Sequence, residues 1–207
     1  MLEQSQQKAL AIGTVHWIDH FVTSTNNIDR WIEFQRQPGH SAEAVWAALT
    51  DPRRLVLWQH AVDFFPELRE GATVYAHLNP EAGAFALGKV TELRPPHVLA
   101  FRWTTTHPML SPDVTLSYAF EDGTLTLRYG PFGKDDAVVP MAASLHIHLD
   151  HLDLAITTPD DQLPVPPWPT PSVVTKSGQM GPTIAAYGAK YPELMKAAPG
   201  GRPPARA

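Results

Sequence analysis

Cysteine is absent from the 207-residue sequence. Disulfide bonds, thiolate metal sites and a cysteine nucleophile are therefore excluded, and the composition is compatible with a reducing compartment. No apolar run in the sequence approaches the roughly 20 residues that a membrane-spanning helix requires. The first residues, MLEQSQQKALAIG, lack the basic and then apolar order of a secretory signal. We therefore expect a cytoplasmic protein without a membrane span.

Long basic runs and nucleotide-binding motifs are absent too. The chain has 16 Lys and Arg against 21 Asp and Glu, a formal net charge of -5, so nucleic acid is not an expected partner. No G-x-S-x-G motif, P-loop or paired-glycine fingerprint is present, so neither a nucleophile-elbow hydrolase nor a nucleotide cofactor is predicted. We expect no cofactor.

Proline is abundant and unevenly placed. Many of the 21 prolines follow Pro159, in PDDQLPVPPWPTP and in APGGRPPARA, and they predict extended chain because proline cannot donate a backbone hydrogen bond. We predict an N-terminal extension at 1–12, one folded domain at 13–158 and a Pro-rich extension at 159–207. Within the last part, GPTIAAYGAKYPELM is compatible with one short helix. The residues beyond Pro159 are expected to add little to the core.

The stretch VWAALTDPRRLVLW, at 45–58, predicts two short helices that meet at a corner. Ser41 has the side chain of an N-cap, and apolar residues follow it at helical spacing. Pro52 cannot continue the first helix but suits the first turn of a second one, with Asp51 as its cap. The two helices should close one end of the domain, with Trp58 at the mouth of any cavity there.

Alternating apolar residues predict strands on both sides of the helix pair. Turn residues join two pairs of these strands, TSTNN in the first pair and Asp122-Gly123 in the last, so both pairs should be hairpins. The strand-like runs are Gly13–Phe21, Ile28–Gln37, TVYAHL, FALGKVTEL, VLAFRWTTT, DVTLSYAFE and TLTLRYGPF.

From about Asp136 the apolar period changes to that of a helix. The apolar stripe of this helix consists of Met141, Leu145, Leu149, Leu152 and Ile156. A meander followed by one long amphipathic helix must bury the helix stripe on a sheet face. We predict an α+β fold, in which a curved antiparallel sheet wraps around a long C-terminal helix and two short helices follow the first strands.

These pieces, in this order, resemble the SRPBCC superfamily, also called START-like or helix-grip, in the branch of the activator of Hsp90 ATPase homologues. The matching pieces are VWAALTDPRRLVLW, ELREGATVYAHL, GKVTELRPPHVLAFRW, YAFEDGTLTLRY and SLHIHLDHL. The resemblance implies a cavity between sheet and last helix that holds apolar or aromatic small molecules. Leu145 stands where the family often has tryptophan, and Gly71-Ala72 replaces a frequent glycine pair.

Strand parity predicts which side chains face inward. Along VLAFRWTTT, the apolar and aromatic residues share one face and Arg102 lies on the other. For the Thr73–Leu78 run both faces are partly apolar, so parity does not decide which face points inward. Plain core packing is the alternative for each residue. The expected ligand-binding residues are Trp58, Phe65, Phe101, Trp103, Thr105, Tyr118, Tyr129, Met141, Leu145 and His148.

The motif HIHLDH raises the question of a metal site. His146 pairs with Asp150 and His148 with His151 at helical spacing, but on two different faces and without a third ligand, so we predict no metal. His148 lies beside the apolar stripe and could reach the cavity as an acid or base. The candidate catalytic residues are His148, Tyr118, Tyr129 and Asp63, each with a purely structural role as its alternative.

Two functions from different classes fit these residues. The first is a carrier or binding protein for a small apolar or aromatic molecule, which needs only an apolar cavity with a few polar anchors. The second is a cofactor-independent cyclase, dehydratase or isomerase, which needs a titratable group inside. A protein-binding module like the co-chaperone members of the superfamily is a third, and a homodimer is left open.

Overall fold

The computed structural model of the chain describes residues 30–59, 61–79, 84–103, 113–132, 138–166 and 178–190. Seven strands form one antiparallel sheet in the order β1-β7-β6-β5-β4-β3-β2. The strands are β1 (Arg30–Arg36), β2 (Ala61–Phe65), β3 (Thr73–Asn79), β4 (Ala84–Arg94), β5 (Val98–Trp103), β6 (Thr115–Glu121) and β7 (Thr124–Phe132). The helices are α2 (Ala42–Thr50), α3 (Pro52–Trp58), α4 (Val138–Asp150), α5 (Leu152–Thr157), the 3-10 helix η1 (Asp160–Gln162) and α7 (Met180–Lys190).

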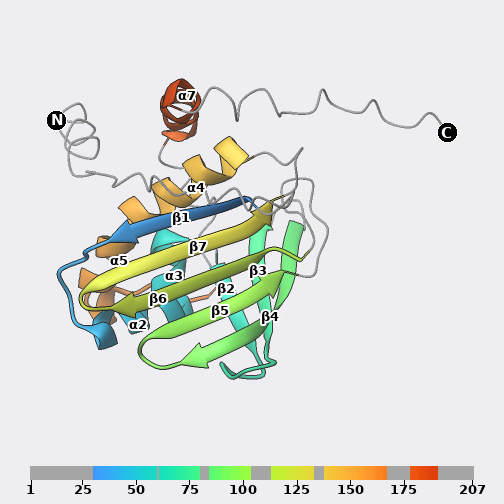
Figure 1. Ribbon diagram of the computed structural model, residues 1–207. Helices are drawn as coiled ribbons and strands as arrows, with labels where there is room; N and C mark the ends of the chain where they lie inside the picture. The colour runs from blue at the N-terminus through green and yellow to red at the C-terminus, as the bar shows by residue number, and fades with distance from the viewer. Residues whose placement is uncertain are drawn as a thin grey trace.

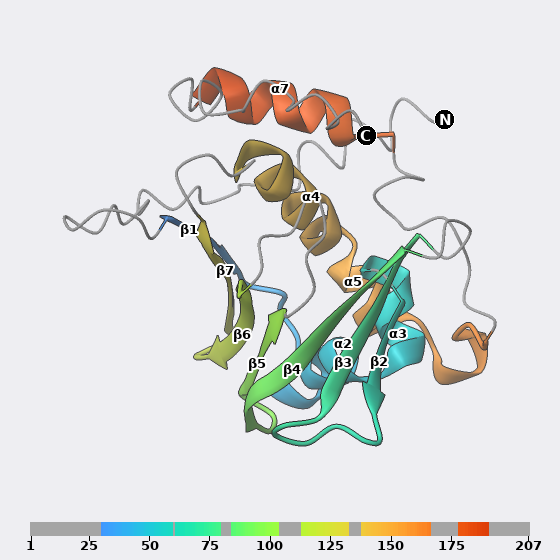
Figure 2. The same ribbon diagram turned by 90° about the vertical axis from the view of Figure 1, so that its right-hand side faces the viewer.

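The sheet is strongly curved, and helices α2 to α5 lie on its concave side (Figure 1). Turned by 90°, the molecule shows three layers at the β1–β7 end, with the sheet, then α4, then α7 outermost (Figure 2). This arrangement confirms the predicted α+β fold, a curved antiparallel sheet around the C-terminal helices. The predicted strand at Gly13–Phe21 lies outside the described residues.

The predicted corner between the short helices is present. Ser41 Oγ accepts a hydrogen bond from the Ala44 amide at 3.3 Å, and Asp51 Oδ1 accepts one from the Arg53 amide at 2.9 Å. Partial burial acts to raise the pKa of Asp51, but the hydrogen bonds from Arg53 outweigh it and hold this pKa below its usual value. The ionised Asp51 side chain therefore caps α3 while Pro52 ends α2.

The predicted long C-terminal helix is interrupted, so the expectation of one continuous helix is wrong. Helix α4 ends at Asp150, and α5 begins at Leu152. At the break, the His151 imidazole Nδ1 lies 2.8 Å from the Ile147 carbonyl oxygen, while the His151 amide donates to His148 O at 3.0 Å. The imidazole thus takes the carbonyl that the backbone amide of a continuous helix would use, because a carbonyl oxygen can only accept. The leucines of the predicted stripe are nevertheless buried: Leu145, Leu149 and Leu152.

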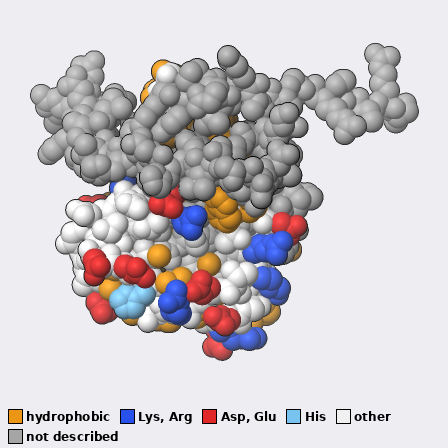
Figure 3. All heavy atoms as spheres, in the orientation of Figure 1, with side chains coloured by type: hydrophobic (Ala, Val, Ile, Leu, Met, Phe, Trp, Pro, Cys, Tyr) orange, Lys and Arg blue, Asp and Glu red, His pale blue; other side chains and the backbone are white. Residues whose placement is uncertain are grey.

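The two faces of the sheet differ in chemistry. The outer face carries acidic and basic side chains side by side (Figure 3), among them the pairs Arg102–Asp113 at 2.9 Å and Arg128–Glu33 at 3.2 Å. Arg102, Arg128 and Glu33 are on strands whose alternate side chains are buried, and Asp113 lies just before β6. Strand parity therefore separates a solvated outer face from an apolar inner face, as the alternation predicts.

The expectation that residues beyond Pro159 add little to the core is wrong. Leu163 and Tyr187 are both buried, and Tyr187 belongs to the main apolar core. Asp160, at the start of η1, receives a hydrogen bond from Arg54 of α3. The described parts of this extension, η1 and α7, therefore pack on the domain.

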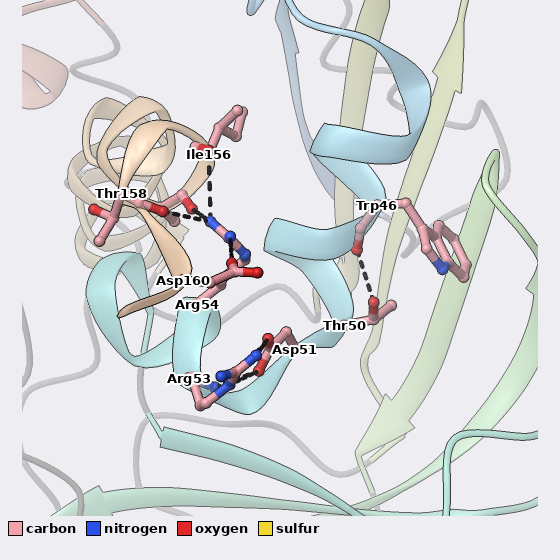
Figure 4. Close-up of polar contacts among 9 residues, drawn as sticks. Trp46, Thr50, Asp51, Arg53, Arg54, Ile156, Thr158 and Asp160 are labelled. Carbon is pink, nitrogen blue, oxygen red and sulfur yellow. Dashed lines mark hydrogen bonds and ion pairs between the residues drawn. The ribbon is translucent and has the colours of Figure 1, made fainter. Parts of the chain in front are cut away.

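Arg54 ties the helix pair to the end of α5 (Figure 4). Its Nη1 atom donates to the carbonyl oxygens of Ala155 at 2.7 Å and Thr158 at 3.1 Å, and its Nη2 atom donates to Asp160. These carbonyls are groups that the end of a helix leaves without a backbone partner, and the partial negative charge there favours a cation. Arg54 therefore acts as a C-cap supplied by another helix.

Replacing Arg54 with alanine should destabilise the protein by about 2 kcal/mol, because it removes charged hydrogen bonds from half-buried carbonyls. The neighbouring Arg53 is the matched control, since its side chain is 44% exposed against 12% for Arg54 and it pairs with Asp51. Urea denaturation of both variants measures the difference. Equal losses for the two substitutions would show that the contact with α5 contributes nothing specific.

Candidate functional site

The inner face of strands β5, β6 and β7 is aromatic. Phe101, Trp103, Tyr118 and Tyr129 are all buried there, as parity predicts. The Phe101 ring packs edge-on against Trp103, with centroids 5.1 Å apart, and lies 6.4 Å from the Tyr118 ring. The surface opposite the C-terminal helices is thus built from rings, two of which carry hydroxyl groups.

The inner face of β3 and β4, by contrast, carries small side chains. Val74 and Ala76 are buried, which settles the side of β3 that faces inward. In β4, a Cβ atom at Gly88 would lie 2.7 Å from the Arg102 carbonyl oxygen and 3.0 Å from Trp103 Cε3. The Trp103 ring therefore lies directly against the β4 backbone, and only glycine permits this approach.

The Gly88→Ala substitution should move the Trp103 ring and destabilise the protein by about 1–3 kcal/mol, because a methyl group cannot overlap a backbone carbonyl. A shift of the tryptophan emission maximum together with urea denaturation tests this. Gly181→Ala is the control, because no atom lies within 4 Å of its added Cβ. Unchanged emission and stability in the Gly88 variant would contradict the close packing of Trp103 on β4.

Trp58 lies in the core rather than at a cavity mouth. It is 0% exposed, its Nε1 atom donates to the Ala48 carbonyl at 2.9 Å, and its ring packs edge-on against Tyr118 at 6.0 Å. Helical spacing correctly predicts that Trp58 lies on the apolar face of α3. The hydrogen bond to Ala48 of α2 holds its indole ring inside the core. Trp58 thereby fixes the angle of the corner between the short helices.

Gln59 is a buried polar residue that the sequence pattern does not mark as part of the site. Its Nε2 atom donates a hydrogen bond to the Tyr118 hydroxyl oxygen. The only sequence signal is its position directly after the apolar face of α3, which gives no hint of its partner on β6. Together, the Gln59 amide and the Tyr118 phenol place a polar pair inside the apolar core.

Burial raises the pKa of Tyr118 well above its ordinary value, and the hydrogen bond from Gln59 offsets only part of this effect. The buried phenol is consequently neutral at every physiological pH. A neutral phenol can donate its proton to an acceptor, whereas a phenolate could not. Tyr118 is therefore a hydrogen-bonding group or a weak acid in this site, and it cannot act as a base at neutral pH.

Alkaline titration tests the state of Tyr118. An unfolded tyrosine ionises near a pKa of about 10, so the raised pKa in the folded protein gives stability that is complete below this pH and is lost as the pH rises further. We expect the free energy of unfolding to fall by up to about 1.4 kcal/mol per pH unit from this group. The Tyr118→Phe variant should decline less steeply than the wild type, and equal slopes would contradict the raised pKa.

His148 and His146 point to different sides of α4. At about 100° per residue, side chains that are two residues apart in a helix differ by about 200° around its axis. His148 is only 5% exposed, and its Nε2 atom is shielded from solvent. His146 Nε2 lies 3.2 Å from Asp150 Oδ2. Among the described residues no group of three or more His, Asp or Glu could hold a metal ion.

The remaining predicted residues are not all at the inner face. Phe65 is 73% exposed, because in β2 it shares a face with Asp63, opposite to Val62 and Phe64, which pack on the core. The expectation that Phe65 lines an interior site is therefore wrong. Thr105 lies outside the described residues.

Met141 and Leu145 complete the predicted set. Leu145 is buried, and Met141 is partly buried and packs against the core. The structure thus brings together in one core Trp58, Phe101, Trp103, Tyr118, Tyr129, Met141 and Leu145. His148 is buried as well, and the buried Gln59 joins this core through Tyr118.

A curved antiparallel sheet closed over its concave face by a C-terminal helix defines the START-like class of proteins. Residues 39–155 match the family described as Activator of Hsp90 ATPase homolog 1-like protein, which is more than half of the chain. The chain therefore belongs to this family, and the resemblance inferred from its sequence is confirmed. Among the described residues, no helix is both long and apolar enough to cross a membrane.

Solved structures share the fold at low sequence identity. CalU16 from Micromonospora echinospora, in solution, is 22% identical over 83% of this chain and 89% of its own, with a TM-score of 0.57. EF2215 from Enterococcus faecalis, a conserved protein of unknown function, is 15% identical over 81% and 88%, with a TM-score of 0.58. DynU16, from the dynemicin biosynthetic locus, is 22% identical over 62% and 47%, with a TM-score of 0.53. A search of curated proteins finds no match.

Proposed function

We propose that the protein binds a small, uncharged, apolar or aromatic molecule between the inner face of the sheet and α4. The observation that carries this proposal is the burial of the Tyr118 hydroxyl, Gln59 and His148 in an otherwise apolar and aromatic interior. Ligand sites of this kind combine apolar walls with a few fixed polar groups. The rings of Phe101 and Trp103 supply the wall, and Tyr118 and His148 supply the anchors.

The charge of the interior favours a neutral ligand. Among the described residues, the buried polar or charged side chains are Gln59 and His148, and no Lys, Arg, Asp or Glu is buried. An anionic group placed there would lose its hydration without gaining a cationic partner of fixed charge. A carbonyl or phenol group, in contrast, could exchange hydrogen bonds with Tyr118 and His148.

A pair of probes with one ring system tests the charge of the ligand. The neutral probe is N-phenylnaphthylamine, and the anionic probe is anilinonaphthalene sulfonate. We expect the neutral probe to bind at least about tenfold more tightly, because the sulfonate must enter without a counter-charge. Both affinities follow from fluorescence titration. Tighter binding of the sulfonate would contradict an uncharged interior site, and native mass spectrometry of the purified protein would identify a natural ligand.

Variants on the two faces of the sheet locate the bound probe. Trp103→Ala should weaken binding of the neutral probe while costing less than the ~3–5 kcal/mol expected of a fully packed tryptophan. Ser117→Ala, on the outer face of β6, is the control and should bind like the wild type. If Trp103→Ala loses the full packing energy and Trp103→Leu restores both stability and binding, Trp103 is packing alone.

A second candidate is turnover of the same ligand, as in a cofactor-independent cyclase, dehydratase or isomerase. Its support is that His148 is an imidazole side chain buried in the apolar interior, and imidazole is the side chain that enzymes most often use for proton transfer. DynU16, which shares the fold, comes from a biosynthetic locus. His148→Gln should then retain binding and abolish turnover, whereas unchanged turnover would remove His148 from the mechanism.

A further inference from the structure

Helix α7 is an addition to the family domain. It lies beyond residues 39–155, the part that matches the family, and it packs on the side of α4 that faces away from the sheet (Figure 2). Met180 and Ile184 of α7 pack against the core, and Tyr187 is only 4% exposed. Spacings of four and three residues place all three on one face of the helix.

The contact between α7 and α4 ends in a polar group. The Tyr187 hydroxyl lies 3.0 Å from His146 Nδ1, and the two rings meet edge-on with centroids 5.8 Å apart. On its other side the His146 ring meets Phe34 of β1, also edge-on, at 6.2 Å. His146 is therefore held between α7 and the edge strand of the sheet.

The polar contacts continue from His146 to the sheet. His146 Nε2 lies 3.2 Å from Asp150 Oδ2, and Arg36 Nη2 donates to Asp150 Oδ1 at 2.6 Å. Arg36 is the last residue of β1, so the series Tyr187–His146–Asp150–Arg36 joins α7, α4 and the sheet. A ring with a polar partner at each nitrogen has a fixed orientation. The series thus fixes the position of α7 along α4.

Helix α7 depends on this contact for its own structure. It has 11 residues and includes Gly181, Pro182 and Gly188, so it is shorter and weaker in helix propensity than a helix that is stable alone. Its opposite face consists of exposed small residues such as Ala185 and Ala189, which bury nothing. Docking on α4 and formation of the α7 helix are therefore coupled.

We propose that α7 is a strap that holds α4 against the sheet and limits how often the interior between them opens. Helix α4 turns His146 toward the strap and His148 toward the interior, so release of α7 acts on the wall of the proposed ligand site. The contacts of Tyr187, His146 and Asp150 support the restraint of α4. Its effect on ligand exchange rests in addition on the proposed function.

Hydrogen exchange of the full-length protein tests the strap. Tyr187→Phe removes the hydroxyl and keeps the ring, so the fold and the apolar contact are retained. Loss of one ordinary hydrogen bond should raise the exchange of α7 amides about fivefold, and the exchange of α4 amides should rise with it. Ala185→Arg, on the exposed face of α7 and with a helix propensity close to that of alanine, is the matched control and should exchange like the wild type.

The outcomes separate the strap from the ligand site. Faster exchange confined to α7, or no change in either helix, would overturn the strap. Dissociation of N-phenylnaphthylamine from Tyr187→Phe should be faster than from the wild type by the same factor as α4 exchange, and an unchanged rate would overturn the control of ligand exchange. Failure of the wild type to bind the probe would count against the proposed function, while α4 exchange would still decide the restraint.

Discussion

The Arg54 guanidinium fixes the helix pair on which the interior polar groups depend. By capping the carbonyls at the end of α5, it joins α3 to the C-terminal helices. Helix α3 then ends with Trp58 inside the core, and Gln59 follows at hydrogen-bonding distance from Tyr118. A guanidinium can bind several carbonyl oxygens at once because its five N–H donors point in different directions within one plane. The contact of Arg54 with α5 thereby helps to position the Gln59 side chain beside Tyr118 in the interior.

Features set by local sequence could be predicted. The Asp51-Pro52 corner follows from capping and from the geometry of proline, which act within a few residues. The inward direction of Phe101, Trp103, Tyr118 and Tyr129 follows from the two-residue period of a strand once the sheet has one buried face. These two local rules, with the order of the elements, were enough to give the fold class and most of the inner face.

Features that depend on a distant partner could not be predicted. Gln59 is recognisable only when β6 brings Tyr118 to it, 59 residues further along the chain. Phe65 has the composition of a cavity residue, but its strand turns it to the outer face. The break after Asp150 arises because the His151 side chain competes with its own backbone for one carbonyl. The short helix that contains Tyr187 could be foreseen, but its burial could not, because the partner of Tyr187 is His146, 41 residues earlier in the chain.

Helix α4 links the polar contact with α7 to the apolar interior, because His146 and His148 lie about half a turn apart around the helix axis. One side carries His146 to the Tyr187 hydroxyl of α7 and the Phe34 ring of β1. The other side carries His148 into an interior without buried ionic side chains among the described residues. A rigid helix cannot move one side without the other. A displacement of α4 at the Asp150–Arg36 contact therefore also displaces the side chains of α4 that face the aromatic wall.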